Sequence, residues 1–404
     1  MGQVSSGKMR DNEDRLLRTL ERKKSKWVEG INSTREMVLS NLTMISQVEA
    51  VPFHEEKRAA LLVERYLAGG IPEPVTDEVH NVIGLIPGTK GDRRILLFTH
   101  MDHMTDMAVD RSITISRDRV LGRGVPEDTM ALASLITIPD VLHRVGVHLE
   151  SDLVILAVSR SHGRGDQGGI RHYMRRHHRE INFAINLAGV PLGTLNYFSL
   201  SRVRADINCQ IDLEPDSLWG RVTNTSAILA INEIINELYR IPLPRQPKTV
   251  INIGVISGGE RYSTISTEAG IKLEVLSEDD EFMESVIEQI HDRCMDAAAK
   301  YDMIVTTDFF GRHKAAGLSY SHPLVKSAVK IIGHLGYRPI MTYNNWELAI
   351  PLSYSIASVS LGITTGELSR GSRGSVDIAP IPTGILQLVM LLIAIDKGFC
   401  DERH

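Results

Sequence analysis

The residues best suited to chemistry in this 404-residue chain are a histidine and an aspartate that follow an apolar run. The run Ile95-Leu-Leu-Phe-Thr99 is typical of a buried strand, and His100 and Asp102 come at its end. The carboxyl ends of strands are where α/β proteins place their sites, so this is a natural start for a metal site. A glycine-rich turn at 122–124 then leads to two more acids, Glu127 and Asp128.

The elements that would position these residues alternate between strand and helix. Periodicity predicts strands at 78–86, 94–100, 112–117, 152–158 and 182–188, and helices at 12–29, 34–48, 55–68, 128–145 and 167–177. Such alternation predicts the α/β class, with a mostly parallel sheet sandwiched by helices. Residues 1–30 are charge-rich, and we expect an exposed leading helix there.

The order of elements changes after residue 202. The patterns then predict strand 203–213, helix 225–239, strands 249–257 and 269–277, helix 280–300 and strand 303–310. This β-α-β-β-α-β order is the ferredoxin-like arrangement. A helix near 323–335, strands near 339–342 and 355–360, and a closing helix at 382–397 resume the α/β pattern. We therefore predict an α/β domain formed by residues 1–202 and 312–404, with a ferredoxin-like domain inserted at 203–311.

Composition excludes several classes of function. A net charge of −5 and a pI near 6.3 give no reason to expect a nucleic-acid partner. No apolar run reaches the ~18–20 residues that a membrane span requires. Three separated cysteines form no CxxC pair and suit a reducing, cytoplasmic compartment. The start, Met1-Gly-Gln-Val-Ser-Ser6, fits the loose pattern for N-myristoylation.

Taken in order, the motifs resemble those of one zinc-dependent family, which includes the aminoacylases, peptidase T, acetylornithine deacetylase and succinyl-diaminopimelate desuccinylase. The resemblance runs from about residue 35 onward. It rests on the two segments above and on Gly163-Arg-Gly-Asp-Gln-Gly-Gly-Ile-Arg171, Ile185-Asn-Leu-Ala-Gly189, Asn252-Ile-Gly-Val-Ile-Ser-Gly-Gly259 and Leu361-Gly-Ile-Thr364. It implies a zinc-exopeptidase-like fold in which the inserted domain is a lid. It also implies cleavage of peptide or amide bonds with two zinc ions, and frequent dimerisation through the lid.

The resemblance also assigns metal-binding roles to residues of this chain. His100 matches the first zinc ligand, and Asp102 matches the acid that orients it. Such a contact fixes the tautomer of the imidazole and strengthens the ligand. The acid that bridges the two ions falls on Glu127, or on Asp128 after a shift of one residue.

The family's remaining site positions carry different chemistry in this chain. A pair of glutamates, of which the first is the general base, falls on Ser161 and His162. A later acid falls on Ala188, the C-terminal histidine falls within 368–371, and the lid histidine falls near 216–217, with no matching residue at any of these positions. Two zinc ions need about four ligands each, most of them deprotonated. We therefore do not expect this site to hold an ion pair.

Two functions of different classes follow. The replaced ligands and general base favour a non-catalytic binding or regulatory protein, which would need no cofactor. The alternative is a divergent peptidase or amidohydrolase with a single zinc ion held by His100, Glu127 and His162, a ligand set that catalytic zinc sites use. Such an ion would lower the pKa of water toward ~7. However, Ser161 cannot accept a proton near neutral pH.

Each of these residues also has a structural explanation. His100 and Asp102 can form a hydrogen-bonded pair that merely stabilises the strand end. Glu127 and Asp128 can cap the helix that follows them. A metal-free serine hydrolase built on the serine and histidine at 161–162 is disfavoured, because adjacent residues at a strand end point to opposite sides.

Three residues are candidates for contacting a substrate. Ser263 follows a glycine turn where family members carry an asparagine that contacts substrate. Arg312 has a guanidinium group whose shape suits a carboxylate. Arg370, with Arg373 close behind it, stands near the lost C-terminal ligand and suggests a cleft that holds an anion; an exposed flexible loop is the alternative. We expect a small anionic or peptide-like ligand, and a homodimer formed through the lid.

Overall fold

The computed structural model describes residues 2–104, 110–211, 226–262, 264–342, 347–368 and 373–402, and at 2–14, 22 and 128 it describes the backbone alone. Contacts divide the chain into two units. The first consists of residues 1–199 and 317–404, and the second of residues 200–316. Each unit has its own hydrophobic core.

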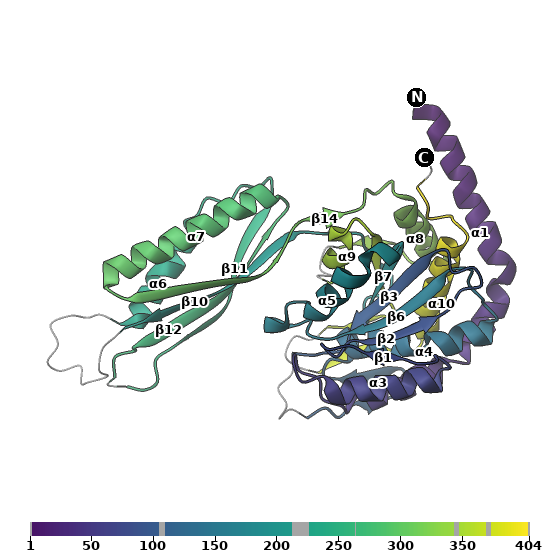
Figure 1. The fold of residues 1–404 in the computed structure, drawn as a ribbon, viewed down its shortest axis with the longest axis horizontal. Helices are drawn as coiled ribbons and strands as arrows, with labels where there is room; N and C mark the ends of the chain where they lie inside the picture. Colours follow the sequence, from purple (N-terminus) through teal and green to yellow (C-terminus); the bar gives the residue numbers. More distant parts are fainter. Residues whose placement is uncertain are drawn as a thin grey trace. The chain divides into compact units, whose positions relative to one another are not determined.

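The first unit is built on an eight-stranded sheet with the order β1-β2-β6-β3-β7-β16-β8-β15 (Figure 1). Its strands β6, β3, β7 and β16 pair in parallel, and the pairs β1–β2, β2–β6 and β16–β8 are antiparallel. The predicted mostly parallel sheet is thus confirmed at its centre. The strands are β1 (Val75–Thr76), β2 (Val82–Ile86), β3 (Arg94–His100), β6 (Asp152–Val158), β7 (Phe183–Ala188), β8 (Thr194–Asn196), β15 (Ile340–Met341) and β16 (Ala357–Gly362).

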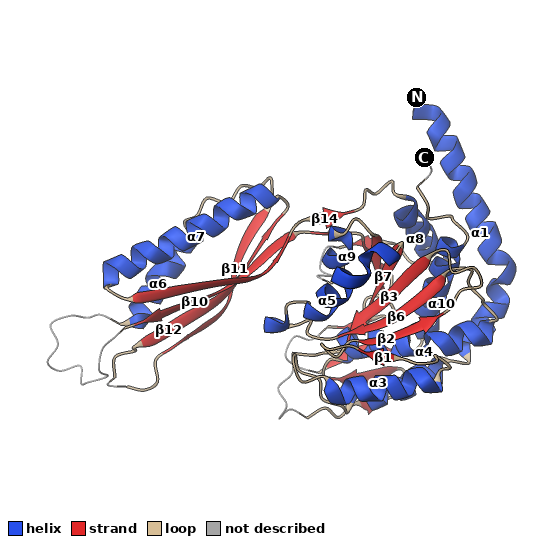
Figure 2. Ribbon diagram, viewed as in Figure 1, coloured by secondary structure: helices blue, strands red, loops and turns tan. Residues whose placement is uncertain are grey.

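Alternating side chains of β3 enter two separate cores, so both faces of the sheet are covered. Figure 2 shows helices around this sheet. Ile95 and Leu97 belong to one core, and Leu96 and Phe98 belong to the other, which also contains apolar side chains of α5. This is the helix-sandwiched sheet that the sequence predicts. The helices of this unit are α1 (Gly2–Asn32), α2 (Arg35–Ser46), α3 (Glu56–Ala68), α4 (Met130–Val145), α5 (Gly168–His177), α8 (Pro323–His334), α9 (Ala349–Ser353) and α10 (Ile381–Asp396).

Helix α1 packs into the core, and the expectation of an exposed leading helix was wrong. Leu16, Leu20, Trp27 and Ile31 recur at helical spacing and are at most 3% exposed. They belong to the same core as residues of α4, α8 and α10. The charged residues between them dominate the composition of the segment, but a narrow apolar stripe is enough to anchor one face of a long helix.

The second unit has the predicted β-α-β-β-α-β order. Its elements are β10 (Ser201–Gln210), α6 (Ala227–Leu238), β11 (Thr249–Gly258), β12 (Glu268–Ser277), α7 (Asp280–Tyr301) and β13 (Ile304–His313). The four strands form an antiparallel sheet in the order β11-β12-β10-β13. Every second residue of β10, from Val203 to Cys209, is buried in a core shared with both helices. This is the ferredoxin-like arrangement.

Several short strands, all except β4 in the predicted strand 112–117, were not predicted, because two to four residues are too few to show a period. They form a four-stranded sheet in the order β17-β18-β5-β4 and a two-stranded sheet β14-β9. Their bounds are β4 (Thr114–Ile115), β5 (Arg119–Gly122), β9 (Phe198–Ser199), β14 (Ala316–Gly317), β17 (Gly366–Glu367) and β18 (Gly374–Asp377). Among the described helices, none combines the length and the hydropathy needed to cross a bilayer.

Candidate functional site

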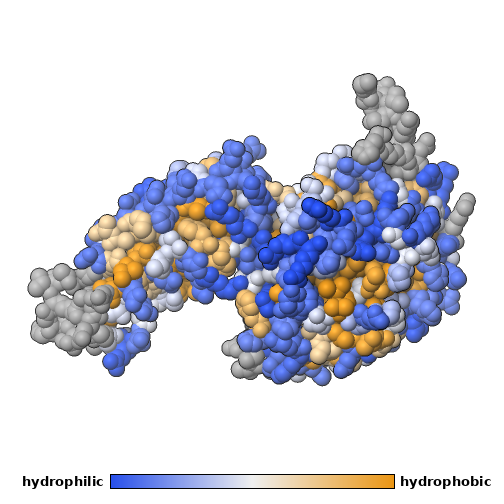
Figure 3. Space-filling model, in the orientation of Figure 1, coloured by the Kyte–Doolittle hydropathy of each residue, from blue (hydrophilic) through white to orange (hydrophobic). Residues whose placement is uncertain are grey.

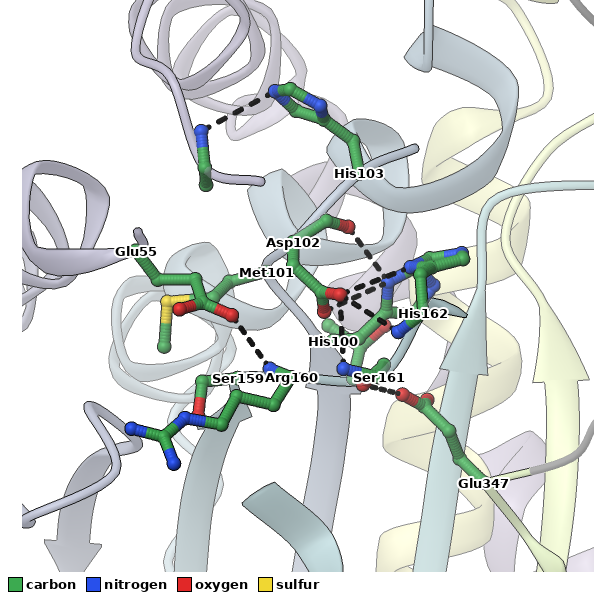
Figure 4. Close-up of polar contacts among 12 residues, drawn as sticks. Glu55, His100, Met101, Asp102, His103, Ser159, Arg160, Ser161, His162 and Glu347 are labelled. Carbon is green, nitrogen blue, oxygen red and sulfur yellow. Dashed lines mark hydrogen bonds and ion pairs between the residues drawn. The ribbon is translucent and has the colours of Figure 1, made fainter. Parts of the chain in front are cut away.

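Two neighbouring strand ends bring the candidate residues together (Figure 4). β3 ends at His100 and its parallel partner β6 ends at Val158, and these two residues are paired in the register of the two strands. The chain continues from β3 to Asp102 and from β6 to Ser161 and His162. Because parallel strands end at the same edge of a sheet, both segments deliver their polar residues to one place.

The Asp102 carboxylate is fully buried and organises this edge. Its Oδ2 accepts hydrogen bonds from the backbone N–H groups of Ser161 and His162, both at 2.9 Å, and from Nδ1 of His162 at 3.2 Å. Its Oδ1 lies 3.9 Å from Nδ1 of His100 and has no hydrogen-bond partner within the described structure. Burial alone would raise the pKa of Asp102, but the hydrogen bond from His162 and the charges of both imidazoles outweigh it and lower the pKa to about 2.

A strained turn after β6 directs the amides of residues 161 and 162 at this carboxylate. Arg160 has a φ of 52°, a left-handed conformation that is uncommon for a residue other than glycine. Glu55 accepts a hydrogen bond from the Arg160 N–H at 2.7 Å, and the Arg160 guanidinium lies 5.2 Å from the centre of the Phe53 ring. Gly165 allows the turn to close, because a Cβ there would approach the Arg160 carbonyl oxygen to 2.6 Å.

Glu55 is a site residue that the sequence did not reveal. It lies at the start of α3 and its side chain is fully buried, although its neighbours Glu56 and Lys57 are exposed. Burial raises the pKa of Glu55, the Arg160 amide lowers it, and the charge of Asp102 raises it further. An acid before a helix is ordinary N-terminal chemistry, so nothing in the local pattern distinguishes Glu55 from Glu56.

His100 and His162 meet beside the Asp102 carboxylate. Their ring centres are 4.7 Å apart and their planes are inclined at 65°. The potential ligand atoms of these two residues and of Asp102 all lie within 4.8 Å of one another. The imidazoles are 17% and 27% exposed, whereas the aspartate is completely covered. Nδ1 of His162 contacts the Asp102 carboxylate, and Nδ1 of His100 contacts the Asp102 backbone carbonyl at 3.1 Å. Either contact orients a ring to offer Nε2 to a metal, so these residues suit one ion.

Beyond the two histidines and Asp102, no described residue joins this group of potential ligand atoms. Ala188 ends β7 and carries no ligand atom. Glu127 lies in a short π-helix, Val125–Thr129, with an exposed side chain, and it is outside the group formed by the two histidines and the aspartate. The side chain of Asp128, the residues at 216–217 and those at 369–371 lie outside the described residues. The donors present therefore fit one divalent ion and not a pair.

Ser161, which the motif resemblance places at a general-base position, contacts a second acid that the sequence did not reveal. Its hydroxyl donates a hydrogen bond to Oε1 of Glu347 at 2.5 Å. Oε2 of Glu347 accepts a hydrogen bond from the Asn186 side chain at 3.1 Å. Glu347 is only 6% exposed, and it precedes α9, far from Ser161 in sequence. A lone acid beside Trp346 and Leu348 carries no motif that would have identified it.

The structure gives a partial account of the predicted substrate contacts. Arg312 lies on β13 in the second unit, where its half-exposed guanidinium pairs with Glu284 at 3.0 Å. Ser263 and Arg370 lie outside the described residues. Arg373 donates a hydrogen bond to the Ser112 hydroxyl at 2.7 Å.

This chain is similar to known proteins in structure and not in sequence. No protein-family model and no curated protein sequence matches this chain. The dipeptidase Dug1p from Saccharomyces cerevisiae is 13% identical with a TM-score of 0.74, and the match covers 92% of this chain and 98% of that one. Human carnosine dipeptidase 1 is 9% identical with a TM-score of 0.74, over 92% and 98% of the two chains. The YXEP protein of Bacillus subtilis, a dinuclear metal-binding peptidase of the M20 family, is 14% identical with a TM-score of 0.64, over 91% and 99%.

This chain therefore has the fold of the M20 metallopeptidases over most of its length. The resemblance inferred from the motifs is confirmed at the level of the fold. Sequence identities this low define architecture alone, so the chemistry has to be argued from the chain's own residues.

Proposed function

We propose that this protein hydrolyses a peptide or amide bond with the help of one divalent metal ion bound by His100 and His162. The observation that carries the proposal is that Nδ1 of each imidazole lies near the same buried carboxylate, at 3.2 Å for His162 and 3.9 Å for His100. The unpartnered Oδ1 of Asp102 supports it, because a buried carboxylate oxygen without a hydrogen bond is costly unless positive charge lies nearby.

The ion would supply Lewis acidity, which polarises a substrate carbonyl group and makes a water molecule more acidic. The chain's own residues would do the rest. Asp102 fixes the tautomer and direction of both rings. The amides of residues 161 and 162 fix Asp102 in turn. The third ligand proposed from the sequence is Glu127, or Asp128 beside it, although Glu127 lies outside the group formed by the other donors.

The second candidate is a non-catalytic binding or regulatory protein. Ala188 and Ser161 favour it, because neither can replace the acid that active family members carry. In that case the buried contact between Asp102 and His162 would stabilise only the turn after β6. Arg370 and Arg373 would then suit a small anionic or peptide-like ligand.

Metal analysis of the purified protein separates the two candidates. After loading with Zn²⁺ and removal of excess metal, we expect stoichiometric zinc in the wild type and loss of zinc in His100→Ala and His162→Ala. His291→Ala is the matched control, because His291 lies in α7 of the second unit and contacts Thr307. Zinc at background level in the wild type would eliminate the single-ion hydrolase.

We also propose a homodimer formed through the second unit. Helix α6 and strand β11 leave Ile228, Leu229, Val255 and Ile256 between 45% and 64% exposed. Figure 3 shows hydrophobic side chains among polar ones on the surface of this unit. β11 is an edge strand, and exposed apolar side chains on such an edge are typical of protein interfaces.

We place the protein in a reducing compartment, the cytoplasm. Cys209, Cys294 and Cys400 are free and buried in the structure. Burial raises the pKa of each thiol, to about 11 for Cys209 and about 12 for the other two, so the unreactive protonated form dominates. Such thiols behave as small apolar side chains in a reducing compartment.

A further inference from the structure

The carboxylate of Glu347 is held in a fixed position at the candidate site. One oxygen accepts the Ser161 hydroxyl at 2.5 Å and the other accepts the Asn186 amide at 3.1 Å. Asn186 is itself fixed, because its Oδ1 accepts a hydrogen bond from the Ser360 hydroxyl at 3.1 Å. Asn186 and Ser360 face each other on the paired strands β7 and β16. The carboxylate is thus anchored to the centre of the sheet.

These hydrogen bonds to Glu347 come from neutral groups. They orient the carboxylate without placing a countercharge on it, unlike the ion pairs that exposed acids of this chain form with Lys or Arg. Burying a carboxylate such as that of Glu347 costs free energy. A carboxylate that is buried and fixed in one orientation despite this cost is typical of a functional site.

Ser161 connects Glu347 to the metal-binding residues. Its backbone N–H donates to Asp102 at 2.9 Å and its hydroxyl donates to Glu347. A hydroxyl has one proton and two lone pairs. With the proton committed to Glu347, the oxygen can accept a hydrogen bond from a water molecule.

We infer that Glu347, acting through the Ser161 hydroxyl, is the proton acceptor of this site, an inference that rests on the proposed hydrolysis. As the water oxygen bonds to the amide carbon, a proton of the water moves to Ser161 Oγ and the Ser161 proton moves to Glu347 Oε1. The π pair of the carbonyl group moves to its oxygen. When the carbon–nitrogen bond breaks, the proton returns from Glu347 through Ser161 to the leaving nitrogen, giving a carboxylic acid and an amine.

The test compares Glu347→Gln and Ser161→Ala with the wild type. Gln keeps the shape and can still accept the Ser161 hydrogen bond, but it is too weak a base to take the proton. Each protein is loaded with Zn²⁺, its metal content is measured, and hydrolysis is assayed with a panel of dipeptides and N-acetyl amino acids. We expect both variants to bind zinc like the wild type, with kcat about 10²–10⁴-fold lower and KM little changed.

Asp396→Asn is the matched control for removing a buried carboxylate. Asp396 accepts two backbone hydrogen bonds at 2.8 Å near the end of α10, and its loss tests destabilisation alone. A Glu347→Gln protein that keeps kcat within about threefold of the wild type would refute the inference and leave the proposed function standing. Loss of zinc from Glu347→Gln would refute it as well, because the residue would then act on metal binding. A zinc-loaded wild type that cleaves no member of the panel would overturn both.

Discussion

At the scale of single residues, the site depends on Asp102. One carboxylate accepts hydrogen bonds from two successive amides and from one imidazole, and it faces a second imidazole. Its pKa of about 2 lies below the ordinary value of 3.8, so the folded protein favours the ionised form. The carboxylate therefore contributes stability that is fully present above the unfolded pKa and is lost as the pH falls through about 2.

Replacing this residue should change stability in a pH-dependent way. Asp102→Asn should lower the free energy of unfolding by about 1–3 kcal/mol near neutral pH, because hydrogen bonds to a buried charge are lost. The deficit should shrink toward zero as the pH approaches about 2, where the wild-type carboxylate also becomes neutral. Urea unfolding followed by circular dichroism across this range measures it. An equal deficit at every pH would show that the charge of Asp102 is not what matters.

Residues that share a strand end could be predicted from the sequence, whereas residues that reach the site from elsewhere could not. The apolar run before His100 and Asp102 defines a buried strand, and the edge where it ends follows from the fold class. Glu55 and Glu347 contact Arg160 and Ser161 across more than a hundred positions of sequence. The spacing of residues along the chain does not predict contacts between side chains so far apart in sequence.

At the scale of elements, the turn after β6 positions the amides of residues 161 and 162 against Asp102. In this turn Arg160 has a left-handed backbone conformation, and its N–H donates a hydrogen bond to Glu55. Backbone strain of this kind persists only where surrounding contacts maintain it. Glu55 is thus expected to support the metal-binding histidine without touching a metal.

Glu55→Ala should therefore weaken zinc binding by about 10–100-fold, as the loss of groups that support ligands does. Glu56→Ala is the control, since that neighbour is exposed and contacts His80 alone among the ion pairs described. Affinity is measured by competition with a chromophoric chelator, and hydrogen exchange should show faster exchange of the amides at 161 and 162. Equal zinc affinity in Glu55→Ala and Glu56→Ala would mean that the turn keeps its conformation without Glu55.

Elements with long, uninterrupted apolar patterns were predicted closely. Elements whose pattern is short or interrupted by charged residues were not. The strands at 94–100 and 152–158 match β3 and β6 residue for residue, because continuous apolar runs bounded by charges have little ambiguity. Helix α1 was predicted too short and exposed, since its apolar stripe is interrupted by charge. Most strands of two to four residues were missed, although the predicted strands at 112–117 and 339–342 contain β4 and β15.

At the scale of the whole molecule, a ferredoxin-like unit is inserted into an α/β unit, and its apolar surface supports the proposed dimer. Ile256→Glu places a charge on the edge strand β11, at a side chain that is 64% exposed. We expect the wild type to sediment as a dimer and the variant as a monomer with unchanged thermal stability. Lys272→Glu, on the central strand β12, is the charge-altering control. A monomeric wild type would contradict the proposal.

The most direct test of the central claim is the zinc-edge X-ray absorption spectrum of the zinc-loaded protein. At this strand edge the described residues supply two imidazoles beside one buried carboxylate, and no further ligand joins that group. We predict a spectrum with scattering from two imidazole rings and no metal–metal vector. A vector at about 3.5–4 Å, the separation in two-metal sites, or a spectrum without imidazole scattering, would contradict the account.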